Sequence, residues 1–147
     1  MNLIEHFIDG KITKGSSKKK SKVFNPATGE QTGEVNLASK ADIDLAVEKA
    51  KKAFENWSIK PPAQRARVIF KFKELIEKHA DEITKLIVSE HGKVYEDAKG
   101  SLTRGLEVVE YACGIPQMLK GEFTENVGTN VDSWSIRQPL GVCAGIT

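Results

Sequence analysis

The pattern of apolar and polar positions changes along the chain, and its first part is typical of short strands. Up to about residue 37, short apolar stretches alternate with turn residues. Asp9 and Gly10 separate two such stretches and accept the positive φ angles of a tight hairpin turn. Residues 35–37 are a further strand candidate, after a turn punctuated by Pro26 and Gly29. The opening of the chain is therefore predicted to consist of short strands, mostly at sheet edges.

From residue 39 onward the apolar positions recur with the spacing of amphipathic helices. Ser39, followed three residues later by Asp42, predicts a capping box at the start of the first helix. Prolines at residues 61–62 separate this helix from a second one, Gly92 ends a third helix and Pro116 ends a fourth. The middle of the chain is therefore predicted to contain four consecutive helices.

The last part of the chain is again predicted to form strands. A polar loop is expected over residues 121–130, followed by a half-buried strand over residues 131–137. Residues 140–146 are continuously apolar, which predicts a strand covered on both faces in the middle of a parallel sheet. Such a strand needs parallel neighbours and crossover connections, which the preceding elements do not supply. We therefore expect the chain to be the front portion of a longer protein with an incomplete α/β fold.

Composition narrows the class of protein. Of the 147 residues, 39% are hydrophobic and 29% are charged, which excludes a disordered tail, a collagen-like repeat and a disulfide scaffold. The net charge of +2 favours neither nucleic acid nor a membrane surface as a partner. No apolar run reaches the roughly 18 residues of a membrane span. The histidines share no ligand spacing with Cys113 or Cys143, so no metal site is predicted, and a cytoplasmic location is expected.

One helical arginine is a candidate binding residue. The fourth predicted helix contains Gly100 and Gly105, and each glycine costs about 1 kcal/mol relative to alanine in a helix interior. Two such glycines indicate the close approach of another backbone or of a ligand. Arg104 lies between them. The residues alone leave two interpretations, a surface arginine paired with Glu107 or Glu110 and an arginine that binds a ligand.

Several motifs, taken in order, resemble the amino-terminal part of the aldehyde dehydrogenase superfamily. They are residues 7–10 (Phe-Ile-Asp-Gly), 25–30 (Asn-Pro-Ala-Thr-Gly-Glu), 50–57, 90–93 (Glu-His-Gly-Lys) and 137–142 (Arg-Gln-Pro-Leu-Gly-Val). Within that superfamily, residues 101–112 and 114–122 are similar to the CoA-acylating methylmalonate-semialdehyde dehydrogenases. The resemblance extends over essentially the whole chain.

The resemblance implies a domain organisation. Residues 1–129 match the amino-terminal part of an NAD-binding domain, with a β hairpin and helices. Residues 130–139 match a strand segment through which members of the family form homo-oligomers. Residues 140–147 match the first core strand of a Rossmann-like sheet, here truncated, and Thr147 matches a position that lines the NAD pocket.

The resemblance also implies a chemistry. Members of the subfamily oxidise malonate or methylmalonate semialdehyde with NAD, transfer the acyl group to CoA and release the carboxylate. A cysteine thiolate attacks the aldehyde, hydride leaves for the nicotinamide, and CoA intercepts the thioester. Arg104 matches the arginine that binds the substrate carboxylate, because a guanidinium can donate two parallel hydrogen bonds to a carboxylate.

The catalytic machinery of the family has no counterpart in the chain. Its nucleophilic cysteine and general-base glutamate match no residue here. Cys113, at a predicted helix end, and Cys143, in the predicted core strand, are interpreted as structural. The chain alone is therefore expected to be inactive.

Other interpretations stay open. The chain could be a fragment of a generic NAD(P)-dependent aldehyde dehydrogenase, a non-catalytic oligomerisation module, or one half of a split enzyme. A module that functions alone is expected to fold cooperatively, whereas a fragment is expected to expose apolar surface.

Overall fold

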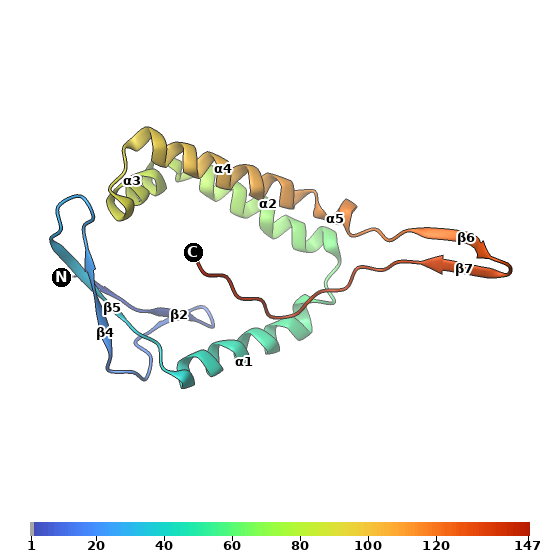
Figure 1. Cartoon of the computed structure of the whole chain (residues 1–147), viewed down its shortest axis with the longest axis horizontal. Helices are drawn as coiled ribbons and strands as arrows, with labels where there is room; N and C mark the ends of the chain where they lie inside the picture. Colours follow the sequence, from blue (N-terminus) through green and yellow to red (C-terminus); the bar gives the residue numbers. More distant parts are fainter. Residues whose placement is uncertain (1) are drawn as a thin grey trace.

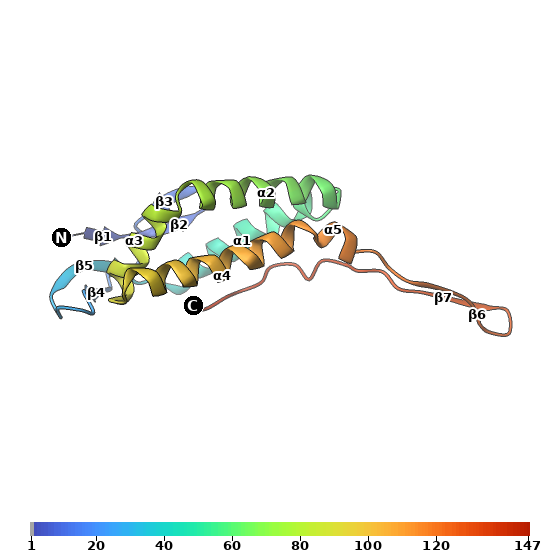
Figure 2. The same cartoon turned by 90° about the horizontal axis from the view of Figure 1, so that it is seen from above.

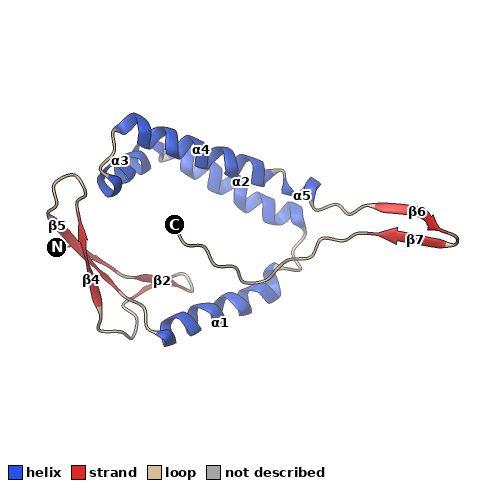
Figure 3. Ribbon diagram, viewed as in Figure 1, coloured by secondary structure: helices blue, strands red, loops and turns tan. Residues whose placement is uncertain are grey.

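The computed structural model describes residues 2–147, and its strands form three separate small units (Figure 1, Figure 3). In the first unit, β5 (Gln31–Asn36) lies between β1 (Asn2–Ile4), which is parallel to it, and β4 (Lys20–Phe24), which is antiparallel. The second unit is the hairpin of β2 (His6–Ile8) and β3 (Lys11–Thr13). The short opening strands predicted from the sequence are therefore confirmed.

The predicted hairpin turn is also confirmed. Asp9 and Gly10 connect β2 to β3 with φ angles of 55° and 74°. Two successive positive φ angles give the turn a twist that matches that of the flanking strands.

Helix α1 (Lys40–Trp57) begins at the predicted capping box. The Ser39 hydroxyl accepts a hydrogen bond from the Asp42 N–H at 3.2 Å, and the Asp42 carboxylate accepts one from the Ser39 N–H at 2.8 Å. The same carboxylate accepts a bond of 2.8 Å from the Ser16 N–H. These bonds, above all the one from the Ser39 N–H, favour the ionised carboxyl group and lower the pKa of Asp42 from its ordinary 3.8 to about 2.

Three further long helices follow, as predicted, together with a short fifth one. They are α2 (Pro62–Lys78), α3 (Ala80–His91), α4 (Tyr95–Cys113) and α5 (Ile115–Met118). Helices α2 and α4 lie side by side, and two views at right angles agree on this (Figure 1, Figure 2). No helix within residues 2–147 is long and apolar enough to cross a membrane.

The predicted polar loop over residues 121–130 is wrong. Strand β6 (Phe123–Gly128) occupies most of it and pairs with β7 (Val131–Trp134), with Phe123 opposite Trp134. Cross-strand pairing with β7 stabilises the aromatic and β-branched residues of β6 in a strand. This stabilisation outweighs the loop preference of the polar residues between them. Both strands are exposed along their whole length, so β7 is not half-buried as predicted. This hairpin projects away from the helices in Figure 1.

The buried strand predicted over residues 140–146 is not formed among residues 2–147, and its place in a longer sheet stays a prediction. The segment has no regular structure, Leu140 is 95% exposed, and Cys143 is exposed. A strand in the middle of a sheet forms only when neighbours accept and donate its backbone hydrogen bonds. No strand within residues 2–147 lies beside this segment, which returns from β7 toward the helices and ends at Thr147 (Figure 1).

The described residues form an open framework. Their accessible surface is 11788 Å² for 16.2 kDa, whereas a compact monomer of that mass exposes about 7500 Å². Few side chains are buried, namely Asn36, Asp42, Ala66, Thr84, Ala98 and Cys113. Large apolar side chains line the uncovered faces of the helices instead.

Candidate functional site

The candidate site lies where the turn after α3 meets the first turns of α4. Gly92 ends α3 in the left-handed conformation, with φ 65°. A Cβ atom on Gly92 would lie 3.2 Å from Pro26 Cγ and 3.4 Å from the Ala27 nitrogen. The turn around Pro26 therefore packs directly against the turn at Gly92, which sets the direction in which Lys93 leaves α3.

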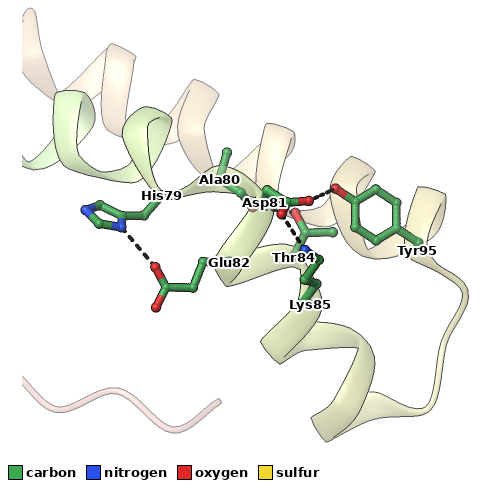
Figure 4. A network of polar contacts seen from close by, with 7 residues as sticks. All are labelled: His79, Ala80, Asp81, Glu82, Thr84, Lys85 and Tyr95. Atoms are coloured by element: carbon green, nitrogen blue, oxygen red, sulfur yellow. Dashed lines mark hydrogen bonds and ion pairs between the residues drawn. The ribbon is translucent and has the colours of Figure 1, made fainter.

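A polar network fixes the first residue of α4 against α3 (Figure 4). The Tyr95 hydroxyl donates to the Asp81 carboxylate at 2.7 Å, and Lys85 Nζ lies 2.6 Å from the other oxygen of that carboxylate. Lys85 and then Tyr95 hold the pKa of Asp81 below its usual value. The start of α4 is therefore joined to α3 by a side-chain contact two residues after Lys93.

Two cationic side chains meet at one hydroxyl group. Lys93 Nζ donates to Ser101 Oγ at 3.1 Å, and Arg104 Nη2 donates to the same oxygen at 3.2 Å. The Ser101 hydroxyl itself donates to the backbone carbonyl of Asp97 at 3.0 Å. A serine hydroxyl has one donor and two acceptor positions, so the three bonds use its full capacity.

Neither cation is paired with a carboxylate. Within residues 2–147, the ion pairs include neither Lys93 nor Arg104. Of the two glutamates considered as partners of Arg104, Glu110 pairs instead with Lys73 on α2, at 3.2 Å, and Glu107 forms no ion pair with any described residue. The interpretation of Arg104 as a surface arginine paired with a glutamate is therefore wrong.

An apolar cavity of about 450 Å³ opens beside Lys93 and Ser101, between α2, α3 and α4. Lys93, Ser101 and His91 provide its polar lining. The rest of the wall is apolar and comes from all three helices, with Phe72, Ile76, Ile87, Leu102, Leu106 and Val109 among its residues. An anion held by Lys93 and Arg104 would therefore have an apolar surface next to it.

The two glycines of α4 play a smaller steric role than the sequence indicates. Gly105 lines the cavity, and a Cβ atom there would meet no atom within 4 Å. A Cβ atom on Gly100 would lie 3.6 Å from Arg104 Nη1, an ordinary contact. Among the described residues, no other backbone approaches either glycine within 4 Å. The close approach of a ligand stays a prediction.

The structure does not bring Thr147 to this site by any hydrogen bond or ion pair among residues 2–147, and Thr147 lies at the exposed end of the irregular segment. Cys113 is buried at the end of α4, as predicted. Cys143 is exposed, contrary to prediction, and its Sγ donates a hydrogen bond to the Gly141 carbonyl, at 3.8 Å.

Comparison with known proteins identifies the class of protein. The model of the aldehyde dehydrogenase family matches residues 12–147, and the chain belongs to this family. It is 48% identical over all its 147 residues to malonate-semialdehyde dehydrogenase of Pseudomonas aeruginosa, and it spans 29% of that protein's length.

Solved structures agree with this assignment. The methylmalonate-semialdehyde dehydrogenase of Oceanimonas doudoroffii superposes with a TM-score of 0.89 at 51% identity, over 95% of this chain and 28% of that one. A candidate methylmalonate-semialdehyde dehydrogenase of Sinorhizobium meliloti 1021, complexed with NAD, superposes with a TM-score of 0.90 at 50% identity, over 96% and 29%. The open framework is therefore a partial aldehyde dehydrogenase fold.

The sequence analysis missed Lys93 and Ser101. A signal for Ser101 was present, because residues three apart on a helix share a face and Ser101 precedes Arg104 by three. Lys93 belongs to a motif that was recognised, at residues 90–93. Its contact with α4, however, depends on how the turn at Gly92 packs, which no local pattern encodes.

Proposed function

We propose that this chain is the amino-terminal part of an NAD-dependent, CoA-acylating malonate- or methylmalonate-semialdehyde dehydrogenase. The complete protein would convert the semialdehyde, CoA and NAD to an acyl-CoA, NADH and carbon dioxide or bicarbonate. The observation that carries the proposal is the guanidinium of Arg104, which is exposed and forms no ion pair among residues 2–147. The family membership and the similarity to the Pseudomonas aeruginosa enzyme support it.

The charge of the substrate explains why such an arginine is needed. Malonate semialdehyde carries a carboxylate at one end and the reacting aldehyde at the other. A guanidinium stays charged throughout the physiological pH range and offers paired N–H donors to a carboxylate. Arg104 is attached to a regular helix, so it would hold one end of the substrate while the aldehyde is presented elsewhere.

The rest of the catalytic machinery lies outside these residues in this proposal. Cys113 is buried, and the Cys143 thiol donates to a backbone carbonyl, so neither thiol is hydrogen-bonded to a base that would activate it among residues 2–147. Residues 140–147 would become a sheet strand with Thr147 at the NAD pocket once neighbouring strands are present, and residues 130–139 would join copies of the enzyme. A cytoplasmic location stays a prediction and agrees with the two unpaired cysteines.

A chimera tests the assignment of Arg104. Residues 1–147 replace the aligned segment of the Pseudomonas aeruginosa malonate-semialdehyde dehydrogenase, and NADH formation is followed with CoA and either malonate semialdehyde or propanal. We expect Arg104→Ala to lower kcat/KM for malonate semialdehyde about 100-fold, the order of magnitude of a lost charge-assisted hydrogen-bond pair. The loss with propanal, which has no carboxylate, stays within about threefold.

A conservative substitution is the control for this test. Arg104→Lys keeps the charge but not the fork of donors, so its loss is expected to be smaller than that of Arg104→Ala. Equal losses on both aldehydes would contradict the role of Arg104. A folded chimera that oxidises propanal but not malonate semialdehyde would favour a generic aldehyde dehydrogenase instead.

A further inference from the structure

We infer that Lys93 and Ser101 complete the carboxylate-binding site: Lys93 binds the carboxylate together with Arg104, and Ser101 is a positioning residue for both cations. The inference rests on the proposed function and extends it to two residues to which the resemblance assigns no role. It is based on the convergence of both cations on Ser101 Oγ, at 3.1 and 3.2 Å.

The Ser101 hydroxyl orients both side chains. Because its proton is given to the Asp97 carbonyl, at 3.0 Å, both acceptor positions are left for N–H donors. One receives the ammonium of Lys93 from the turn after α3, and the other receives the guanidinium of Arg104 from one turn further along α4. Each cation keeps unused donors, two on the ammonium and four on the guanidinium.

Two like charges beside one neutral oxygen repel each other unless an anion lies near them. Lys93 is half-buried, so the repulsion is less screened there than between fully exposed side chains. No carboxylate among residues 2–147 pairs with either cation. A bound carboxylate, with two oxygens and about four acceptor positions, would use the unused donors of both cations and remove the repulsion.

The neighbouring cavity selects what is attached to that carboxylate. Lys93 and Ser101 lie in its lining, and most of the remaining wall is apolar. A second charged group would lose its hydration against this wall. The site therefore fits a small molecule with one anionic end and an uncharged remainder, such as a semialdehyde, better than a dicarboxylate.

Lys93→Met in the chimera tests the inference, with Lys99→Met as the matched control. Lys99 is an exposed lysine of α4 outside every ion pair of residues 2–147, and the cations that donate to Ser101 Oγ among these residues are Lys93 and Arg104. We expect Lys93→Met to raise KM for malonate semialdehyde about tenfold, as for one lost charge-assisted hydrogen bond, with KM for propanal and both kcat values within about twofold. Lys99→Met is expected to leave KM for both aldehydes within about twofold.

Ser101 is tested by a pair of substitutions. Ser101→Ala removes the common acceptor and is expected to raise KM for malonate semialdehyde severalfold without lowering kcat. Ser101→Thr retains the hydroxyl and is expected to restore KM to within about twofold of the parent. If Ser101 had a merely structural role, its substitution would lower kcat with both aldehydes. KM for malonate semialdehyde would then not differ between Ser101→Ala and Ser101→Thr as described.

Binding of 3-hydroxypropionate, an unreactive monocarboxylate, provides a readout that does not need turnover. Its dissociation constant, measured by calorimetry on the chimera, is expected to rise about tenfold in Lys93→Met and to increase with salt concentration in the parent. One result would overturn the inference alone: the parent chimera turns over malonate semialdehyde, and Arg104→Ala impairs that aldehyde more than propanal, whereas Lys93→Met does not. The inference would then be wrong and the proposed function would stand. If the parent rejects malonate semialdehyde but binds the acid through Lys93, the proposed function fails and the anion site stands.

Discussion

Asp42 shows how one side chain can join segments that are distant in sequence. Its carboxylate completes the capping box with Ser39 and also accepts a hydrogen bond from the Ser16 N–H, 26 residues earlier. The ionised form makes all of these bonds as an acceptor, and the pKa of Asp42 falls from 3.8 to about 2. Because the folded-state pKa is depressed, the stabilisation is present above the unfolded-state pKa and is lost as the pH falls through the folded one.

We therefore predict that Asp42→Asn destabilises α1 and the segment before β4 at neutral pH. The gap in urea midpoint between the parent chimera and Asp42→Asn is expected to be constant above about pH 5 and to narrow as the pH falls below 3.8 toward 2. Asp44→Asn is the control, since the Asp44 carboxylate contacts only the exposed Lys40. A gap that does not depend on pH would contradict the electrostatic part of this account.

At the scale of elements, the turn between α3 and α4 carries much of the site. Gly92 adopts a left-handed conformation and packs against Pro26, while Tyr95 and Asp81 join the helices on the other side of Lys93. Gly92 and Tyr95 lie one residue before and two residues after Lys93, so we expect a displacement of this turn to change the distance between Lys93 and Ser101 on α4.

Gly92→Ala is predicted to lower stability and to raise KM for malonate semialdehyde in the chimera. Its Cβ atom would lie 3.2 Å from Pro26 Cγ at a φ of 65°, so the turn must shift in addition to the strain of a positive φ. Gly10→Ala is the matched control, because its φ is 74° and a Cβ there meets nothing within 4 Å. Both variants are expected to lose about 1–2 kcal/mol from the backbone conformation, but only Gly92→Ala is expected to change KM.

Equal KM values for the two variants would show that Lys93 does not depend on the packing of this turn. Thermal midpoints of both chimeras, measured beside the KM values, separate the loss of stability from the displacement of the site.

At the scale of the whole molecule, the dominant feature is uncovered apolar surface. The accessible area of 11788 Å² exceeds by more than half the value of about 7500 Å² for a compact monomer of this mass. Leu140 and Ile146 of the last segment and Trp134 of β7 are among the exposed apolar side chains. In the solved relatives, which are more than three times as long, further chain is present.

We predict that the 147-residue chain by itself has helical circular dichroism, binds a hydrophobic dye and unfolds over a broad temperature range, and that it forms no NADH from malonate semialdehyde. The chimera is the control and is expected to unfold sharply without binding the dye. A sharp transition and no dye binding by the chain alone would instead support a module that functions by itself.

The sequence by itself determined the elements whose stabilising contacts are local. The hairpin turn at Asp9 and Gly10, the capping box at Ser39 and the succession of helices were all predicted correctly. Their hydrogen bonds join residues a few positions apart, so the pattern that encodes them lies within one short window. The two glycines beside Arg104 made it a candidate, the resemblance to a family favoured a role in binding a carboxylate, and that role stays a prediction.

Only the tertiary structure decided what depends on distant partners. The apolar run at 140–146 is predicted to form a strand only beside other strands. The residues of β6 have the pattern of a polar loop, and they form a strand because β7 pairs with them. The meeting of Lys93 with Arg104 at Ser101 likewise joins the turn at Gly92, which packs against Pro26, to the middle of α4. Such contacts depend on the relative placement of whole elements, and a periodic pattern along one element carries no information about that placement.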